Sequence, residues 1–294
     1  MTATALVVGD VMTDIIVVPE GPIVAGSDRR ASIRSRPGGS GANQAVWLAA
    51  AGAPVRFAAR VGAADRALYE THFRQRSVEP VLAGDTALPS GVLVTLIDPA
   101  GERSFLTDRG ANLNLCPADL GGRLLDDIGL LLVSGYSFFA PGPRAAVQEL
   151  LAEARRRAIP VAIDPASTGF LAEVGPAAFR DWVGPADWLF ANADEATLLA
   201  GDTATEAQMR ALGSQFRQVV IKRGAAGAAL GGAAGIALSR PAPAVRALDT
   251  TGAGDAFAAG FLAALLRGEP PENCLEHAIA NGARAVQTLG GQPQ

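Results

Sequence analysis

The amino-acid sequence predicts an α/β fold with a mostly parallel central sheet and a second, smaller β-sheet. Short apolar runs rich in β-branched residues alternate with longer alanine-rich amphipathic runs through most of the 294 residues, which is the pattern of strands and helices in an α/β protein. The alternation is broken twice, at residues 11–36 and 91–112, where β-branched residues, turn residues and charges gather. These two segments predict the smaller sheet.

The elements of the main sheet follow from those runs in order. Buried strands are expected at residues 5–9, 55–59, 130–134, 160–164, 188–191 and 219–222. Helices are expected at residues 41–51, 66–76, 143–158, 193–200, 205–213, 253–267 and 271–289. Pro143 stands at the first turn of one helix, and Gly213 and Gly268 follow two others, as helix boundaries commonly do.

The smaller sheet is expected to use strands at residues 15–18, 92–97 and 104–107. The sequence Asp-Pro-Ala-Gly at 98–101 predicts the turn that joins the last two as a hairpin. Because both segments leave the main fold and return to it, they read as a lid inserted between the first strands. Two ordinary edge hairpins on a single domain are the alternative.

Composition excludes several classes of protein. Hydrophobic residues make up 49% and charged residues 18%, which is typical of a globular chain. The net charge is −4 with no basic stripe, so nucleic-acid binding has no electrostatic support. The two cysteines, Cys116 and Cys274, lack the spacing of a disulfide framework or a cysteine zinc site. No secretory signal and no apolar run of membrane-spanning length is evident, so we expect a cytoplasmic protein without membrane contact.

Residues 249–257, Asp-Thr-Thr-Gly-Ala-Gly-Asp-Ala-Phe, carry the strongest chemical signal. They precede an apolar helical run, and a helix N-terminus offers unpaired N–H groups and a partial positive charge. The backbone of Gly252, Ala253 and Gly254 is therefore expected to hold an anion such as a phosphate. Asp255 beside it makes sense as a base that deprotonates a hydroxyl nucleophile. A tight turn followed by a capping aspartate is the alternative.

Residues 36–44, Arg-Pro-Gly-Gly-Ser-Gly-Ala-Asn-Gln, form a second glycine-rich stretch before a helix. It lacks the lysine of a P-loop. Together the two motifs, ~200 residues apart, resemble the N-terminal and C-terminal signatures of the ribokinase-like (PfkB) family of carbohydrate and nucleoside kinases. The resemblance covers essentially the whole chain and implies a three-layer ribokinase-like fold. It implies an α/β nucleotide- and substrate-binding domain (residues 1–10, 37–90 and 113–294) with a β lid (residues 11–36 and 91–112).

The resemblance also implies roles for individual residues. Substrate hydroxyls would be bound by Asp14 and Asn43, with Gly38 and Gly39 letting the backbone approach the sugar. The nucleotide would be bound by Asn192, Glu195, Lys222, Gly224, Gly227, Thr251 and Asn281. Glu195 would hold Mg²⁺ through water. Taken alone, the spacing of Asn192 and Glu195 is equally that of a helix capping box.

The expected reaction is transfer of the γ-phosphoryl group of ATP to a hydroxyl of a sugar or sugar acid. A nucleoside kinase and a sugar-phosphate kinase are the alternatives within the family. Few aromatic residues in the lid segments disfavour a nucleoside, whereas Arg29, Arg30, Arg34 and Arg36 keep a phosphorylated sugar open. A non-catalytic sensor is disfavoured because the base and the anion-binding motif are both intact.

The resemblance adds two further expectations. Some family members bind a monovalent cation such as K⁺ near the anion-binding loop, and Asp249 and Thr251 would take part here. Lids of this type often form a dimer contact, so a homodimer through the lid is expected.

Overall fold

The protein contains a nine-stranded sheet in the order β13-β12-β11-β10-β9-β8-β1-β4-β5. The computed structural model describes residues 3–98 and 103–293. Strands from β5 to β11 in this order pair in parallel, and β12 and β13 add an antiparallel edge. The strands are β1 (Thr4–Val8), β4 (Val55–Gly62), β5 (Val78–Asp85), β8 (Ile128–Ser134), β9 (Val161–Asp164), β10 (Ala186–Asn192), β11 (Phe216–Lys222), β12 (Ala228–Gly232) and β13 (Gly235–Arg240).

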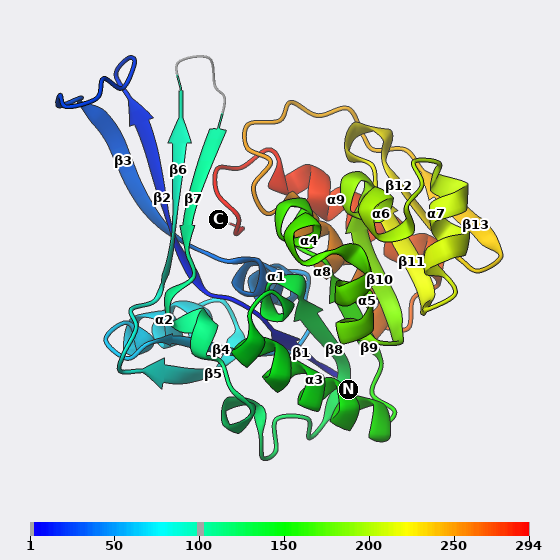
Figure 1. Ribbon diagram of the computed structural model, residues 1–294. Coiled ribbons are helices and arrows are strands. Elements are labelled where there is room, and N and C mark those ends of the chain that lie inside the picture. The colour runs from blue at the N-terminus through cyan, green and yellow to red at the C-terminus, as the bar shows by residue number, and fades with distance from the viewer. Residues whose placement is uncertain (1–2, 99–102, 294) are drawn as a thin grey trace.

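Helices cover both faces of this sheet, which gives a three-layer α/β/α arrangement (Figure 1). One core holds residues of α1 (Ser40–Ala50), α2 (Arg66–Arg74), α8 (Ala253–Leu266) and α9 (Pro271–Ala285). The core on the other face holds residues of α3 (Pro141–Arg156), α4 (Thr168–Val174), α5 (Pro176–Val183), α6 (Ala193–Ala200) and α7 (Thr205–Leu212). Helix α8 is apolar on all sides because it packs against α1, α9 and the sheet.

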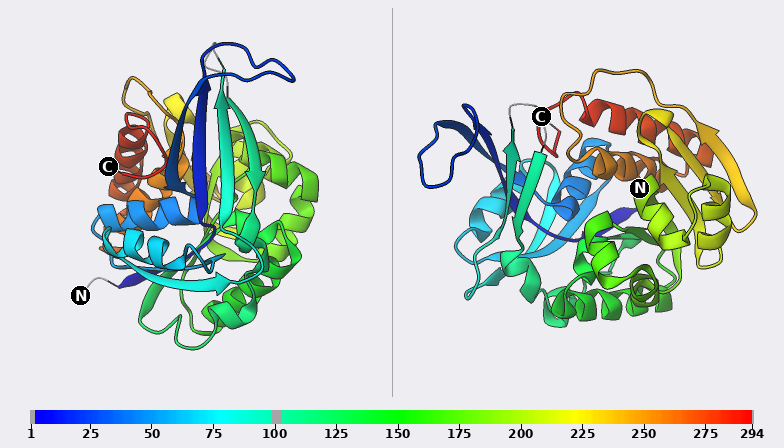
Figure 2. Two further views of the ribbon diagram at one scale, coloured as in Figure 1. Left: turned by 90° about the vertical axis from the view of Figure 1, so that its left-hand side faces the viewer. Right: turned by 45° about the horizontal axis from the view of Figure 1, so that its top comes forward.

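A four-stranded sheet in the order β3-β2-β6-β7 projects from one side of this body (Figures 1 and 2). Its strands are β2 (Met12–Pro19), β3 (Ala31–Gly38), β6 (Gly91–Ile97) and β7 (Arg103–Asp108). Most of the predicted turn at 98–101 lies outside the described residues. The sheet is built from the two segments expected to form a lid. The division of the chain into lid and body stays a prediction.

The predicted three-layer fold is confirmed, and the differences are shifted element ends and several elements that were not predicted. Helix α9 ends at Ala285 instead of residue 289. The chain departs there because the carbonyl of Val286 accepts hydrogen bonds from the N–H groups of Leu248 and Asp249. Sequence analysis missed β3, β5, β12, β13, α4 and α5, and β3 continues to Gly38, past the expected lid boundary at residue 36. No helix within residues 3–98 and 103–293 is long and apolar enough to span a membrane.

Candidate active site

The carboxyl ends of neighbouring parallel strands carry polar side chains along one edge of the nine-stranded sheet. Asp10 follows β1, and β8, β9, β10 and β11 end in Ser134, Asp164, Asn192 and Lys222. The helices that follow β1 and β8 pack on opposite faces of the sheet. In open α/β sheets such a reversal creates a crevice in which ligands bind. The strand ends beside β1 and β8 are therefore the expected place for a site.

The N-terminus of α8 lies over these strand ends. Gly252 is its N-cap and has a φ of 73°, which favours glycine. A Cβ on Gly252 would lie 2.5 Å from the carbonyl oxygen of Gly291, so the loop has no room for a side chain. A Cβ on Gly254 would lie 3.3 Å from Lys222 Nζ. The glycine motif thus places a helix N-terminus next to a cation, an arrangement suited to an anionic ligand. The Ala253 N–H donates to the carbonyl of Thr250 at 3.3 Å in this structure.

Asp255, in the first turn of α8, meets the start of α1. Ser40 Oγ donates to Asp255 Oδ1 at 2.7 Å, and Asn43 Nδ2 donates to Asp255 Oδ2 at 3.1 Å. Burial, followed by repulsion from the Asp164 carboxylate, raises the pKa of Asp255 to about 7 despite these hydrogen bonds. A carboxyl group poised near neutrality suits proton transfer at physiological pH.

Asp14 lies on β2, facing a second glycine pair. Asp14 is 7% exposed, and its Oδ1 accepts no hydrogen bond from the described residues. A Cβ on Gly38 would lie 2.1 Å from Asp14 Oδ2, and one on Gly39 (φ 96°) would lie 2.6 Å from the carbonyl oxygen of Asp10. Burial, then the charges of Asp10 and Asp249, raise the pKa of Asp14 to about 7. A buried acceptor without a partner is well suited to a ligand hydroxyl.

Lys222 is held by acidic neighbours below the α8 cradle. Its Nζ donates to Asp164 Oδ2 at 2.8 Å. Burial by itself would lower the pKa of Lys222, but the carboxylates of Asp164 and Glu195 raise it on balance. Burial raises the pKa of Glu195 to about 7, although the Lys222 charge opposes this. Lys222, Asp164 and Glu195 therefore combine one cation with two buried carboxyl groups. An anion or a divalent cation bound beside them would change the protonation of these carboxyl groups.

The capping interpretation of Asn192 and Glu195 is correct as local structure. Asn192 Oδ1 accepts from the Glu195 N–H at 2.8 Å, and Glu195 Oε2 accepts from the Asn192 N–H at 2.8 Å. The box fixes the start of α6 and holds Glu195 near Lys222. A nucleotide or Mg²⁺ role for the pair stays a prediction. Within the described residues, no three His, Cys, Asp or Glu side chains cluster as metal ligands would, so any metal here would depend on phosphate and water oxygens as well.

The remaining predicted residues surround the same edge. Gly224 and Gly227 bracket the turn after β11, both with positive φ. Asn281 of α9 packs against Gly260 of α8, where a Cβ would lie 2.9 Å from its Nδ2. The Asp249 carboxylate accepts from the N–H groups of Thr251 and Gly290 at 3.0 and 2.9 Å, joining the loop before α8 to the C-terminal loop.

Sequence reasoning missed several neighbours of these residues. Asp10 accepts from Arg109 Nη1 at 3.1 Å, and the Arg109 guanidinium lies 4.5 Å from the ring centre of Tyr136. Ser40, which donates a hydrogen bond to Asp255, belongs to the glycine-rich stretch at residues 36–44, but the sequence suggested no role for its hydroxyl group. Asp164 could have been found from its place at the end of a predicted strand. The contact between Arg109 and Asp10 could not be predicted from a local sequence pattern, because the two residues are 99 positions apart.

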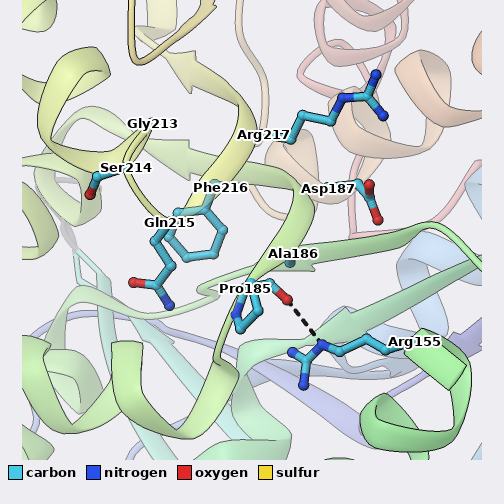
Figure 3. Close-up of a pocket in the computed structure, with 9 residues that line it drawn as sticks. All are labelled: Arg155, Pro185, Ala186, Asp187, Gly213, Ser214, Gln215, Phe216 and Arg217. Carbon is cyan, nitrogen blue, oxygen red and sulfur yellow. Dashed lines mark hydrogen bonds between the residues drawn. The ribbon is translucent and has the colours of Figure 1, made fainter. Parts of the chain in front are cut away.

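A cavity of about 360 Å³ opens between the four-stranded sheet and the loops around α8. It is lined by Asp14, Asp249, Thr251 and Gly290, and by alternate residues of the sheet. A second cavity of about 390 Å³ lies at the amino ends of β10 and β11, where Arg155 donates to the carbonyl of Pro185 (Figure 3). It contains none of the predicted site residues. The first cavity is therefore the one connected with the site.

Comparisons with known proteins give matches along almost the whole chain. The family model described as pfkB family carbohydrate kinase matches residues 2–294. An ATP-dependent ribose-1-phosphate kinase from Halopiger xanaduensis is 32% identical over 277 residues, covering 90% of this chain and 86% of the relative. The bifunctional protein HldE of Pseudomonas savastanoi is 31% identical, and the match covers 99% of this chain but 60% of that protein.

Solved structures give the same fold. A probable sugar kinase from Rhizobium etli superposes with a TM-score of 0.88 at 22% identity, over 100% of this chain and 96% of that one. The Arabidopsis thaliana ribokinase complexed with ribose and ATP superposes with a TM-score of 0.80 at 25% identity, with the same coverage.

Proposed function

The chain belongs to the pfkB family of carbohydrate kinases and is an ATP-dependent phosphotransferase of the ribokinase type, and on that premise we propose that it phosphorylates a hydroxyl group of a sugar or sugar acid. The observation that carries this proposal is the position of Asp255, whose carboxyl is held by Ser40 and Asn43 at the N-terminus of α8.

In the proposed reaction, a substrate hydroxyl lies beside Asp255. The hydroxyl oxygen forms a bond to the γ-phosphorus of ATP, the bond from that phosphorus to the bridging oxygen breaks, and ADP leaves. Asp255 accepts the hydroxyl proton. The hydrogen bonds from Ser40 and Asn43 orient its carboxyl, so one oxygen lone pair faces the nucleophile.

The transferred group would be stabilised by the N–H groups of Gly252, Ala253 and Gly254 and by the charge of Lys222. An oxyanion donor of this kind is typically worth ~3 kcal/mol in the transition state. Glu195 is the residue that would hold Mg²⁺ through water. When bound, Mg²⁺ would neutralise charge on the phosphate oxygens. Asn192, Gly224, Gly227, Thr251 and Asn281 remain the proposed nucleotide contacts.

The substrate would occupy the cavity that is lined by the four-stranded sheet. The position of this sheet on the cavity supports the interpretation of residues 11–36 and 91–112 as a lid. Asp14 and Asn43 would bind its hydroxyl groups, and the tight packing at Gly38 and Gly39 lets the backbone approach them. Phe105 is the one aromatic residue among those that line the cavity within the described residues. A nucleoside kinase, which would stack a base, therefore remains the less favoured alternative.

The test is ADP release by the purified protein with Mg²⁺ and ATP, across a panel of sugars, sugar acids and nucleosides. Asp255→Asn should lower kcat by ~100- to 10,000-fold with little change in substrate affinity. Glu272→Gln is a matched control, because Glu272 is an exposed carboxylate in the first turn of α9. Unchanged turnover in Asp255→Asn would remove Asp255 as the base.

Two further proposals concern regulation and assembly. A monovalent cation near Asp249 and Thr251 would make activity depend on K⁺, and a flat potassium titration would exclude that dependence. A homodimer through the lid is supported by the exposed apolar side chains of Ile33 (64%) and Leu106 (60%) on the face of the four-stranded sheet that points away from the cavity. Ile33→Asp should then give monomers in light scattering.

A further inference from the structure

The cavity face of the four-stranded sheet is defined by strand alternation. Successive side chains of a strand point to opposite faces, and paired residues share a face. The register pairs Asp14 with Arg36 and Ile16 with Arg34. The sheet residues that line the cavity are Asp14, Ile16, Val18, Ser32, Arg34, Arg36, Leu93, Thr95, Ile97 and Phe105. Two arginines of β3 thus lie on the same face as the proposed hydroxyl-binding Asp14.

Charges in this cavity are arranged from an acidic end to a basic end. Asp14 lies next to Asp249 and Thr251, on the side of α8. Arg34 is two residues further along β3 from Arg36, a step of roughly 6.5 Å along a strand. A substrate with hydroxyl groups at Asp14 would therefore extend toward Arg34.

The two guanidinium groups differ in their partners. Arg36 donates through Nη1 to the carbonyl of Leu289, and so links the sheet to the C-terminal loop. The side chain of Arg34 makes no hydrogen bond or ion pair with any residue in 3–98 or 103–293. Neither arginine neutralises Asp14, whose pKa is raised by burial and by neighbouring carboxylates. Arg34 is therefore a cation on the cavity wall with its donors available.

A guanidinium fork matches a phosphate or carboxylate and gains little from a neutral sugar beyond what water already provides. Arg34 is exposed and lines the cavity, so its guanidinium is accessible to an anionic group bound there. Resting on the proposed function, we propose that the substrate carries an anionic oxyacid group, a phosphate ester or a carboxylate, remote from the reacting hydroxyl, and that Arg34, supported by Arg36, binds it.

The experiment compares a pentose with its aldonic acid and with its 1-phosphate and 5-phosphate, by ADP release under identical conditions. The anionic members should have the higher kcat/KM. Arg34→Met should lower their kcat/KM by roughly 10- to 100-fold, mainly through KM, because hydrogen bonds to a charged group are lost far from the reacting atoms. Arg34→Lys should restore part of the loss, and the KM of the anionic substrate should rise with salt.

Arg30→Met is the matched control. Arg30 is an exposed arginine of the same β2–β3 segment that does not line the cavity, so its loss changes the net charge equally and should leave KM unchanged. A preference for the phosphates over the aldonic acid would identify a sugar-phosphate kinase, and the reverse would identify a sugar-acid kinase.

Failure of this inference differs from failure of the proposed function. Turnover of the neutral pentose at a kcat/KM equal to that of its anionic relatives, unaltered by Arg34→Met, would overturn the role of Arg34 and leave the kinase assignment intact. Equal losses in Arg34→Met and Arg30→Met would also overturn it, since the effect would then be one of net charge. Absence of ADP release with the whole sugar, sugar-acid and nucleoside panel would count against the proposed function, and the inference would fall with it.

Discussion

Asp255 illustrates how a single side chain acquires a property that its sequence motif only suggests. The motif puts a carboxyl beside backbone N–H groups, which by themselves would favour the charged form. Burial and the nearby Asp164 carboxylate outweigh that effect and raise the pKa of Asp255 to about 7.

The pH dependence of the reaction should follow from this. A base must be ionised to accept a proton, so kcat/KM should fall about tenfold per pH unit below pH ~7 and level off above it. Glu195 titrates in the same range, so the profile should be recorded for Glu195→Gln as well. The acidic limb should persist in that variant. A profile that stays flat from pH 5.5 to 8.5 in both proteins would argue against Asp255 as the base.

Lys222 and Asp164 form a buried ion pair, with side chains 13% and 5% exposed. Removing one partner of such a pair leaves an uncompensated buried charge. Lys222→Met should therefore lower the free energy of unfolding by about 3 kcal/mol and raise the KM for ATP. Adding Asp164→Leu should recover much of the stability, measured by urea unfolding, but not the KM. If the double variant recovered both the stability and the KM for ATP, the role of Lys222 would be structural only.

Among the elements, α8 combines a structural and a proposed chemical role. Its apolar body fills the core between α1, α9 and the sheet, which fixes its N-terminus over the strand ends. At the N-terminus, a Cβ on Gly254 would meet Lys222 Nζ at 3.3 Å, while the backbone there has no positive φ.

Gly254→Ala should separate these two roles. Alanine is the better helix former by roughly 0.5–1 kcal/mol, so thermal denaturation should show a Tm equal to or above that of the parent protein. The added methyl group narrows the space between the cradle and Lys222, so kcat should fall. A variant that lost stability and activity together would contradict this separation.

At the scale of the whole molecule, the four-stranded sheet is tied to the body by a few polar contacts. Thr13 Oγ1 and Tyr69 Oη lie 2.6 Å apart. Asn112 bonds the N–H and carbonyl of Val11 at 3.0 and 2.9 Å, which joins the chain segments that enter and leave the sheet. Arg36 reaches the C-terminal loop. These contacts hold Asp14 near the body, where burial raises its pKa to about 7.

Global stability should depend on pH through Asp14. Its folded-state pKa lies above the ordinary value of 3.8, so the folded state binds the extra proton between pH 4 and 7. The free energy of unfolding should therefore fall as pH rises through this window, by on the order of 1–3 kcal/mol relative to Asp14→Asn. Urea unfolding of both proteins at pH 4.5 and 8 measures the difference. If the free energy of unfolding depended on pH equally in the two proteins, the folded state would not raise the pKa of Asp14.

The sequence by itself determined the layered α/β class, the small sheet and the N-terminus of α8, because these follow from local periodicity and glycine placement. It also determined which residue types could hold an anion or accept a proton. The capping spacing of Asn192 and Glu195 was readable for the same reason, since a helix cap joins residues three positions apart.

Only the tertiary structure decided which of those residues meet. Asp255 contacts Asn43 across 212 positions and Lys222 contacts Asp164 across 58, distances at which no local pattern carries information. Strand order and register bring Arg34 and Arg36 to the same cavity face as Asp14, whereas Arg29 and Arg30 of the same segment do not line the cavity. At the C-cap of α9, the Val286 carbonyl accepts hydrogen bonds from the N–H groups of Leu248 and Asp249, a contact with a distant segment that no local pattern could show.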